Sequence, residues 1–231
     1  GSEMCIRDRF GTVHRNHSSN SAIVKHFATK SMGLLIEKEV KFLSDELSNP
    51  SKPLTLIIGG SKIDTKIGVI ENFLGVADNI IIGGAMANTF LLAMNHKVGI
   101  SLVEKNKITT AKNLLKKASK KGTNFILPRD FSGELDSFGS GNICIADAND
   151  IPKNMICEDI GEKSIQLFTN IISSSKTLLW NGTLGVAENL NFAAGTNRIV
   201  DAIIENQLTS IVGGGDTVAA IRNYNGNLIE K

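Results

Sequence analysis

The chain has 231 residues, of which 42% are hydrophobic and 21% are charged, and its formal net charge is +2. This balance is typical of a soluble globular protein, and without a long acidic or basic block the chain shows no sign of a nucleic-acid or membrane partner. Its apolar runs of about four to six residues are far shorter than the roughly 20 that a membrane-spanning helix needs.

The cysteines Cys5, Cys144 and Cys157 form no CxxC pair, and their odd number argues against a disulfide framework or a zinc site. The N-terminus lacks the apolar core of a signal peptide. We therefore expect a reduced, cytoplasmic setting. Residues 1–9 join abruptly to the segment after them and residues 227–231 resemble the approach to another strand, so we expect a fragment with a foreign or misread start.

The first predicted element is a helix of about fifteen residues that begins near Ser31. Residues 10–30 are polar and predict no clear element. After them, Ile36, Val40, Leu43 and Leu47 recur at helical spacing, and Ser31 is suited to cap the helix. Asn49-Pro50 ends the pattern, and the Pro-bounded loop after it is a candidate domain connector.

From residue 54 onward one module repeats, in which a short apolar run is followed by a helical pattern. Strands are predicted at 54–58, 80–82, 124–127, 176–180 and 210–212, and helices at 63–74, 85–94, 104–121, 162–174 and 193–206. Strands that alternate with helices predict parallel βαβ units, and continuous apolar runs indicate burial on both faces. The predicted fold is a three-layer α/β, doubly wound parallel sheet that is Rossmann-like and truncated at both ends. Residues 130–160 are less regular, with a candidate turn at 138–141 and a candidate strand at 142–146.

Glycines follow four of the predicted strands, at Gly59-Gly60, Gly83-Gly84, Gly182 with Gly185, and Gly213 to Gly215. In such sheets the ligand lies outside the carboxyl ends of the strands. Glycine lets backbone N–H groups approach a phosphate, and a helix N-terminus favours negative charge. One such junction is commonly a simple turn, but four together predict a phosphate- or nucleotide-binding edge.

The last of these junctions continues as Asp216-Thr217, and Asp216 has two interpretations. It could cap the next helix, or it could reach a phosphate-bound Mg²⁺ through a carboxylate oxygen. The common nucleotide and hydrolase motifs GxxxxGK[ST], GxGxxG after a strand, GxSxG and HExxH do not occur. Nucleotide binding therefore requires another arrangement.

Lys62 and Lys66 lie four residues apart at the predicted start of a helix, where they would share one face. Two ammonium groups repel each other there and also oppose the positive helix terminus. Such a costly pair predicts an anionic ligand, and positive charge of this kind suits phosphoryl transfer. The alternative is that one lysine simply points into solvent.

Four segments, GGSKIDTK, IIGGAMANTF, LLWNGTLGVAE and GGGDT, resemble phosphoglycerate kinase in their order and spacing, and GTVHR at residues 11–15 resembles the family's GTxHR segment. The resemblance implies a kinase that passes a phosphoryl group between 1,3-bisphosphoglycerate and ADP, with Mg²⁺ and ATP or ADP as ligands, and we expect a monomer. It also implies three parts: a non-native start and glycerate-domain remnant (1–30), an interdomain helix (31–50) and an incomplete nucleotide-binding domain (51–231).

The resemblance also implies a role for each matching residue. Lys62 matches the lysine that follows the transferring phosphoryl group, and with Gly214 it is the expected catalytic pair. Asp216 matches the Mg²⁺ ligand, and His14 with Arg15 matches part of the patch that binds the 3-phosphoglycerate phosphate. Gly83 and Gly84 match the adenine slot, and Glu188 matches the acid that binds the ribose. The residues that match the site of the nucleotide phosphates are Lys66, Asn181, Gly213, Gly214, Gly215 and Thr217.

Three residues depart from the family pattern. Thr183 and Ala187 replace the Pro and Phe of WNGPxGxFE, and Glu158 stands where an apolar residue would line the adenine. The resemblance also implies that most of the glycerate domain and the C-terminal segment are missing, and because in-line transfer needs both substrates held together, we expect the fragment to be inactive. Two alternatives are a non-catalytic nucleotide-binding module, which would lose the lysine pair, and an NAD-dependent oxidoreductase, which should show GxGxxG.

Overall fold

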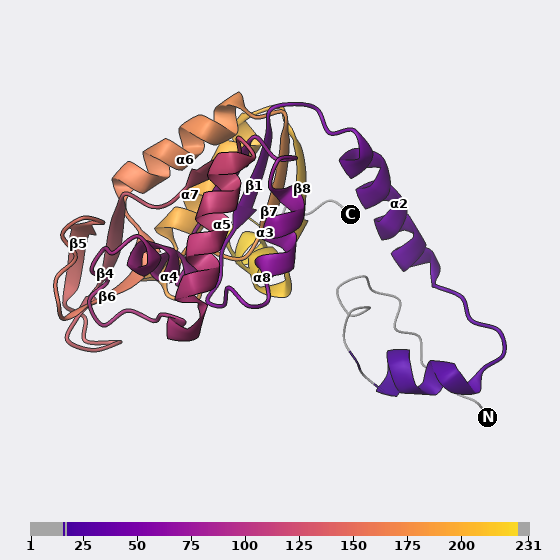
Figure 1. Ribbon diagram of the computed structural model, residues 1–231, viewed down its shortest axis with the longest axis horizontal. Coiled ribbons are helices and arrows are strands. Elements are labelled where there is room, and N and C mark those ends of the chain that lie inside the picture. The colour runs from indigo at the N-terminus through magenta and orange to yellow at the C-terminus, as the bar shows by residue number, and fades with distance from the viewer. Residues whose placement is uncertain (1–15, 17, 226–231) are drawn as a thin grey trace. The chain divides into compact units, whose positions relative to one another are not determined.

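A computed structural model describes residue 16 and residues 18–225 of the chain. The chain forms two compact units, Gly1–Pro50 and Ser51–Lys231, and Figure 1 labels many of their helices and strands. Within the described residues, no helix is long and apolar enough to cross a membrane.

The first unit contains a π-helical turn η1 (Ser18–Ala22), a 3₁₀ turn η2 (Ile23–His26) and the helix α2 (Leu34–Ser48). The expectation of no element before residue 30 is therefore wrong, because such single turns need no periodic apolar face that a sequence pattern would show. The expected cap is also wrong. Gly33 is the N-cap residue of α2, and no side-chain cap hydrogen bond is made there.

The second unit contains the predicted parallel sheet. Its strands are β1 (Leu54–Ile58), β2 (Asn79–Ile82), β3 (Asn124–Ile126), β7 (Thr177–Asn181) and β8 (Thr209–Gly213), in the order β3-β2-β1-β7-β8. All four neighbouring pairs are parallel, which confirms the predicted fold class. Ile58 pairs with Asn181, and Asn181 pairs with Gly213, so the carboxyl ends of β1, β7 and β8 are level at one edge.

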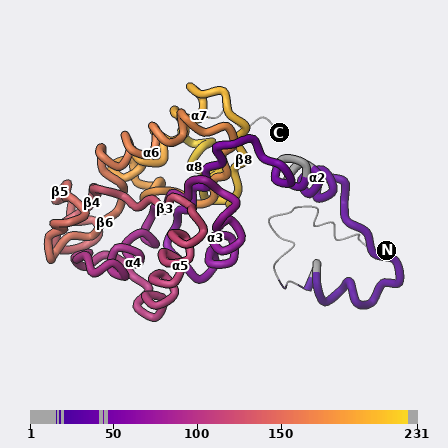
Figure 2. The backbone as a smooth tube through the Cα atoms, turned by 45° about the horizontal axis from the view of Figure 1, so that its top comes forward, coloured from indigo at the N-terminus to yellow at the C-terminus, as the bar shows by residue number. Residues whose placement is uncertain are grey.

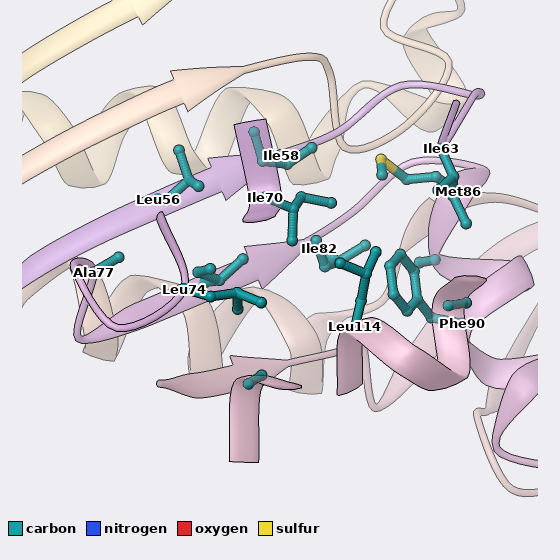
Figure 3. Close-up of a cluster of buried hydrophobic side chains, with 14 of the residues drawn as sticks. Leu56, Ile58, Ile63, Ile70, Leu74, Ala77, Ile82, Met86, Phe90 and Leu114 are labelled. Carbon is teal, nitrogen blue, oxygen red and sulfur yellow. The ribbon is translucent and has the colours of Figure 1, made fainter. Parts of the chain in front are cut away.

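Helices cover both faces of this sheet. One face packs on α3 (Ile67–Phe73), α4 (Met86–Ala93) and α5 (Ile108–Lys120). The other face packs on α6 (Glu162–Ser174), α7 (Ala194–Glu205) and α8 (Gly215–Tyr224). Two short 3₁₀ turns, η3 (Lys105–Lys107) and η4 (Leu190–Phe192), precede α5 and α7. Figure 2 shows α3 and α5 on the side of the sheet opposite α6 and α7. Leu56 and Ile58 point into the first core, which Figure 3 shows with Ile70 and Phe90, whereas Ile57 points into the second. Burial on both faces explains the continuous apolar runs.

Residues 130–160 form a second, antiparallel sheet, in which β4 (Asp130–Leu135) lies between β5 (Ile143–Asp147) and β6 (Met155–Ile160). The sequence predicted only a strand at 142–146, because buried carboxylates interrupt the apolar pattern of β4 and β6. The register between β4 and β6 shifts after Ser132, so that Ser132 pairs with Asp159 and Gly133 pairs with Cys157. Glu158 is the extra residue of this bulge.

Candidate functional site

A pocket of about 250 Å³ opens at the carboxyl ends of β1, β7 and β8. Three loops line it, one after each strand, and their residues are Gly59, Gly60, Ser61, Lys62, Thr65, Lys66, Asn181, Gly182, Thr183, Gly214, Gly215, Asp216 and Thr217. The level strand ends explain why residues as far apart in the chain as Gly59 and Thr217, which are 158 positions apart, meet at one place. Seven of the predicted nucleotide-site residues therefore lie in one pocket: Lys62, Lys66, Asn181, Gly214, Gly215, Asp216 and Thr217.

The loops after β1 and β7 approach each other through their backbones. The N–H of Gly59 donates to the carbonyl oxygen of Asn181 at 2.9 Å, and the N–H of Gly60 donates to that of Thr183 at 2.9 Å. A Cβ atom on Gly59 would lie 2.1 Å from the Thr183 carbonyl oxygen. Only glycine fits at position 59, so its presence follows from this close approach.

The lysine pair lies in the pocket, but not on one helix face as predicted. The helix α3 begins at Ile67, with Lys66 as its N-cap residue, so Lys62 belongs to the preceding loop. The loop is held from outside: the carboxylate of Glu104 accepts a hydrogen bond from the N–H of Ile63, and Lys107 pairs with Asp64 at 2.5 Å. Because these tertiary contacts hold the residues before Ile67 in a loop, the helix begins later than the apolar spacing predicted.

The ammonium group of Lys66 donates a hydrogen bond to Oδ1 of Asn181 across the pocket. Partial burial lowers the pKa of Lys66, and the nearby negative charge of Asp216 opposes that shift. Lys66 is thus hydrogen-bonded to Asn181 and interacts electrostatically with Asp216. A lysine that loses solvation in this way gains from an additional anion in the pocket.

The third loop, Gly213 to Gly215, leads directly into α8. Gly214 has φ of 92°, a conformation that favours glycine, and it is the N-cap residue of α8, where it has no side chain to satisfy the first N–H groups. The N-terminus of this ten-residue helix thus presents N–H groups and positive dipole to the pocket. Asp216 lies in the first turn rather than at the N-cap, so the interpretation of Asp216 as a cap is wrong.

Four predicted nucleotide-site residues do not line the pocket: Gly83, Gly84, Glu188 and Gly213. A Cβ atom on Gly83 would lie 2.2 Å from Cδ2 of Leu184, and one on Gly84 would lie 2.5 Å from the backbone nitrogen of Gly60. These two glycines therefore allow close packing against the neighbouring loops. Glu188 lies farther along the loop after β7 and does not reach the pocket wall.

Two further predicted residues, His14 and Arg15, lie outside the described residues. Gly213 ends β8 next to the pocket, where a Cβ atom would lie 3.3 Å from Nδ2 of Asn181.

The sequence did not single out several residues that support the pocket. Ser61 and Thr65 line it, and their position inside GGSKIDTK was the available signal. Asp159 is buried beneath the loop after β7, where its carboxylate accepts hydrogen bonds from the N–H groups of Gly195 at 2.8 Å and Ile160 at 2.9 Å. Burial raises the pKa of Asp159 to about 7, although these two donors oppose the shift. No local pattern marks such a long-range contact.

The donor set of the pocket suits a metal ion only together with a ligand. Among the described residues, no group of three or more His, Cys, Asp and Glu side chains could hold a metal by itself. Asp216 offers one carboxylate at the pocket wall. One carboxylate completed by phosphate oxygens and waters is the usual environment of protein-bound Mg²⁺, so Asp216 fits a phosphate-bound Mg²⁺ rather than a protein-only site.

The sequence is similar to known proteins along almost its whole length. The family model described as "Phosphoglycerate kinase" matches residues 2–228. The chain is 43% identical over 223 residues to a phosphoglycerate kinase of Thermosipho africanus, covering 95% of this chain and 55% of the relative. It is 41% identical over 219 residues to one of Finegoldia magna, with the same coverage.

Solved structures agree with this similarity. The structure of phosphoglycerate kinase from Coxiella burnetii matches with a TM-score of 0.84 and 34% identity, over 94% of this chain and 56% of that chain. The enzyme from Pyrococcus horikoshii matches with a TM-score of 0.78 and 26% identity, over 94% and 55%. The chain thus spans about half the length of the relatives that it matches.

Proposed function

The chain belongs to the phosphoglycerate kinase family, and we propose that it supplies the Mg-nucleotide half of that activity. The reaction is reversible phosphoryl transfer between 1,3-bisphosphoglycerate and ADP, which gives 3-phosphoglycerate and ATP. The observation that carries this proposal is the meeting of Lys62, Lys66 and Asp216 in one pocket with the N-terminus of α8. Both lysines of the pair are present there, which favours a kinase over a non-catalytic nucleotide-binding module.

The proposed roles follow from the charge that phosphoryl transfer develops. The transferring group spreads negative charge over its equatorial oxygens, and fixed positive groups stabilise it. Lys62, on the loop after β1, would follow that group, and the N–H of Gly214 would donate to one of its oxygens. The N–H groups of Gly213 and Gly215 and the hydroxyl of Thr217 would hold the remaining phosphates.

Lys66 and Asn181 would orient the nucleotide phosphates. Their mutual hydrogen bond keeps the ammonium group at the pocket wall without a nucleotide. A phosphate oxygen would compete with the neutral Oδ1 of Asn181 for that ammonium group, because a charge-assisted hydrogen bond is the stronger one. The amide group of Asn181 could then turn its Nδ2 donor to the phosphates.

Asp216 would hold the Mg²⁺ that accompanies ATP or ADP. The ion would neutralise part of the phosphate charge when bound. Asp216 also lies near Lys66, whose charge it stabilises, so its carboxylate would balance the lysine in the absence of nucleotide.

Other roles in the proposal come from the resemblance. Gly83 and Gly84 would form the adenine slot, Glu188 would bind the ribose hydroxyls, and His14 with Arg15 would bind the 3-phosphoglycerate phosphate. Residues 31–50 would be the interdomain helix, and residues 51–231 would be the nucleotide-binding domain. We further propose a monomer that, alone, does not phosphorylate ADP, since in-line transfer needs both substrates held by both halves of the enzyme.

Calorimetric titration of the chain with Mg-ADP tests the nucleotide site, with NAD as the control ligand. We expect binding of Mg-ADP, no binding of NAD, and weaker binding by Asp216→Asn in the presence of Mg²⁺. Binding of NAD instead would favour an oxidoreductase. Measurable phosphorylation of ADP from 1,3-bisphosphoglycerate by the chain alone would refute the proposed inactivity.

A further inference from the structure

Two buried carboxyl groups face each other in the small antiparallel sheet. Glu134 lies on β4 and is 3% exposed, and Glu158 lies at the bulge of β6 and is 5% exposed. The carboxylate of Glu134 accepts hydrogen bonds from the N–H groups of Gly139 and Gly141, the latter at 3.0 Å. Neither carboxyl oxygen of Glu158 has a hydrogen-bond partner among the described residues. A buried polar group in this state needs an explanation.

The surroundings of Glu158 favour its neutral form. Burial, followed by the Glu134 carboxyl group, raises the pKa of Glu158 to about 7, although the nearby backbone N–H of Glu134 opposes the shift. The other titratable groups nearby are Asp159 and Cys157 on β6 and Cys144 on β5, and burial raises the pKa of the Cys157 thiol to about 11. No lysine, arginine or histidine among the described residues contributes to the shift of Glu158. Two close carboxyl groups in such a place cannot both be ionised without large cost.

The bulge also connects this pair to the nucleotide pocket. The backbone oxygen of Glu158 accepts a hydrogen bond from the N–H of Val186 at 2.9 Å. Next along the strand, the Asp159 carboxylate lies so close to Gly185 that a Cβ atom there would be 2.3 Å from its Oδ1. Val186 and Gly185 belong to the loop whose first residues, Asn181 to Thr183, line the pocket. The bulge at Glu158 is therefore in direct contact with that loop.

We propose that Glu134 and Glu158 share one proton near neutral pH, and that this proton positions residues 184–188 beside the nucleotide pocket. With the proton present, the Glu158 hydroxyl donates to the Glu134 carboxylate, which keeps its two N–H donors from the 139–141 turn. When the proton is lost to solvent, the two carboxylates repel and the bulge moves. Val186 then loses its fixed acceptor. Both glutamates are positioning residues, and the consequence for ligand binding rests on the proposed nucleotide site.

Amide hydrogen exchange of the full chain at several pH values tests this inference. We expect the protection factor of Val186, which corrects for the intrinsic pH dependence of exchange, to fall about fivefold or more between pH 6 and pH 8. Glu158→Gln cannot ionise, so its profile should be clearly flatter than that of the wild type, with only the part due to Asp159 remaining. Glu205→Gln removes an exposed carboxylate and should behave as the wild type. If Glu158→Gln keeps the wild-type profile, Asp159 or another group is responsible and the inference is overturned.

A second measurement covers the case in which Glu158→Gln fails to fold. Carbon-13 titration of the glutamate carboxyl groups in the wild type should show one of the pair titrating near neutral pH. Titration of both in the ordinary range of glutamate would overturn the inference.

Mg-ADP titration at the two pH values separates the two proposals. Loss of pH-dependent exchange with intact ADP binding refutes only the shared proton, whereas absent ADP binding with intact pH-dependent exchange refutes only the nucleotide site.

Discussion

The hydroxyl group of Thr217 accepts a hydrogen bond from the backbone N–H of Gly182 at 2.8 Å. This bond ties the first turn of α8 to the end of β7, and Thr217 is completely buried. Gly182 has φ of 101°, so its backbone turns sharply there and directs the N–H toward the neighbouring loop. Two walls of the pocket are thereby held together without any ligand.

Thr217→Val should destabilise the unit Ser51–Lys231. The substitution keeps the size of the side chain but leaves the partly buried N–H of Gly182 without its acceptor, which costs about 1 kcal/mol. Thr217→Ser retains the hydroxyl and should lose less. Urea unfolding followed by the fluorescence of Trp180, the single tryptophan of the chain, measures the difference. Equal stability of the Val variant and the wild type would show that the bond contributes nothing.

Gly83→Ala should be much more damaging than Gly68→Ala. A Cβ atom at position 83 would lie 2.2 Å from Cδ2 of the buried Leu184 side chain, so that side chain must repack, at a cost of about 1–3 kcal/mol. Position 68 lies in α3 with no atom within 4 Å of a new Cβ. There alanine should stabilise the helix by about 0.5–1 kcal/mol. Thermal unfolding of the two variants provides the comparison, and a stable Gly83→Ala would contradict the close approach.

The sequence predicted the large sheet well because each of its strands is covered on both faces. Leu54 to Ile58 is a continuous apolar run, and such a run followed by glycine has few other interpretations. The small sheet was largely missed because its strands bury Glu134 and Glu158, and buried carboxyl groups break the apolar pattern by which a strand is predicted. The same limit applies to the pocket. Its glycines and lysines were visible in the motifs, whereas the contact of Glu104 with Ile63 depends on residues 41 positions apart.

Lys66→Met should weaken binding of Mg-ADP by about tenfold or more, since a charge-assisted contact to phosphate typically contributes about 1.5–3 kcal/mol. The same substitution should leave the free energy of unfolding nearly unchanged or raise it slightly, because it removes a partly buried ammonium group. Lys117→Met is the matched control, as Lys117 forms an exposed ion pair with Glu71 on α3, away from the pocket. Calorimetry and unfolding together distinguish a binding role from a structural one. If both variants bind Mg-ADP equally well, Lys66 is not a phosphate contact.

The stability of the second unit should fall as pH rises from about 5 to 7. The folded state holds a proton on Glu158 up to about pH 7, whereas the unfolded chain releases it near the ordinary glutamate pKa of 4.5. Over this window the folded state binds more protons than the unfolded state, so the free energy of unfolding decreases with pH. For Glu158 alone the slope is at most about 1.4 kcal/mol per pH unit. Asp159 should add a slope of the same sign, since its pKa is also raised to about 7.

Denaturant unfolding at pH 5, 6 and 7 measures the slope, and Glu158→Gln should remove the part due to Glu158 while leaving that of Asp159. A variant slope as steep as that of the wild type would mean that Glu158 is ionised in the folded protein throughout.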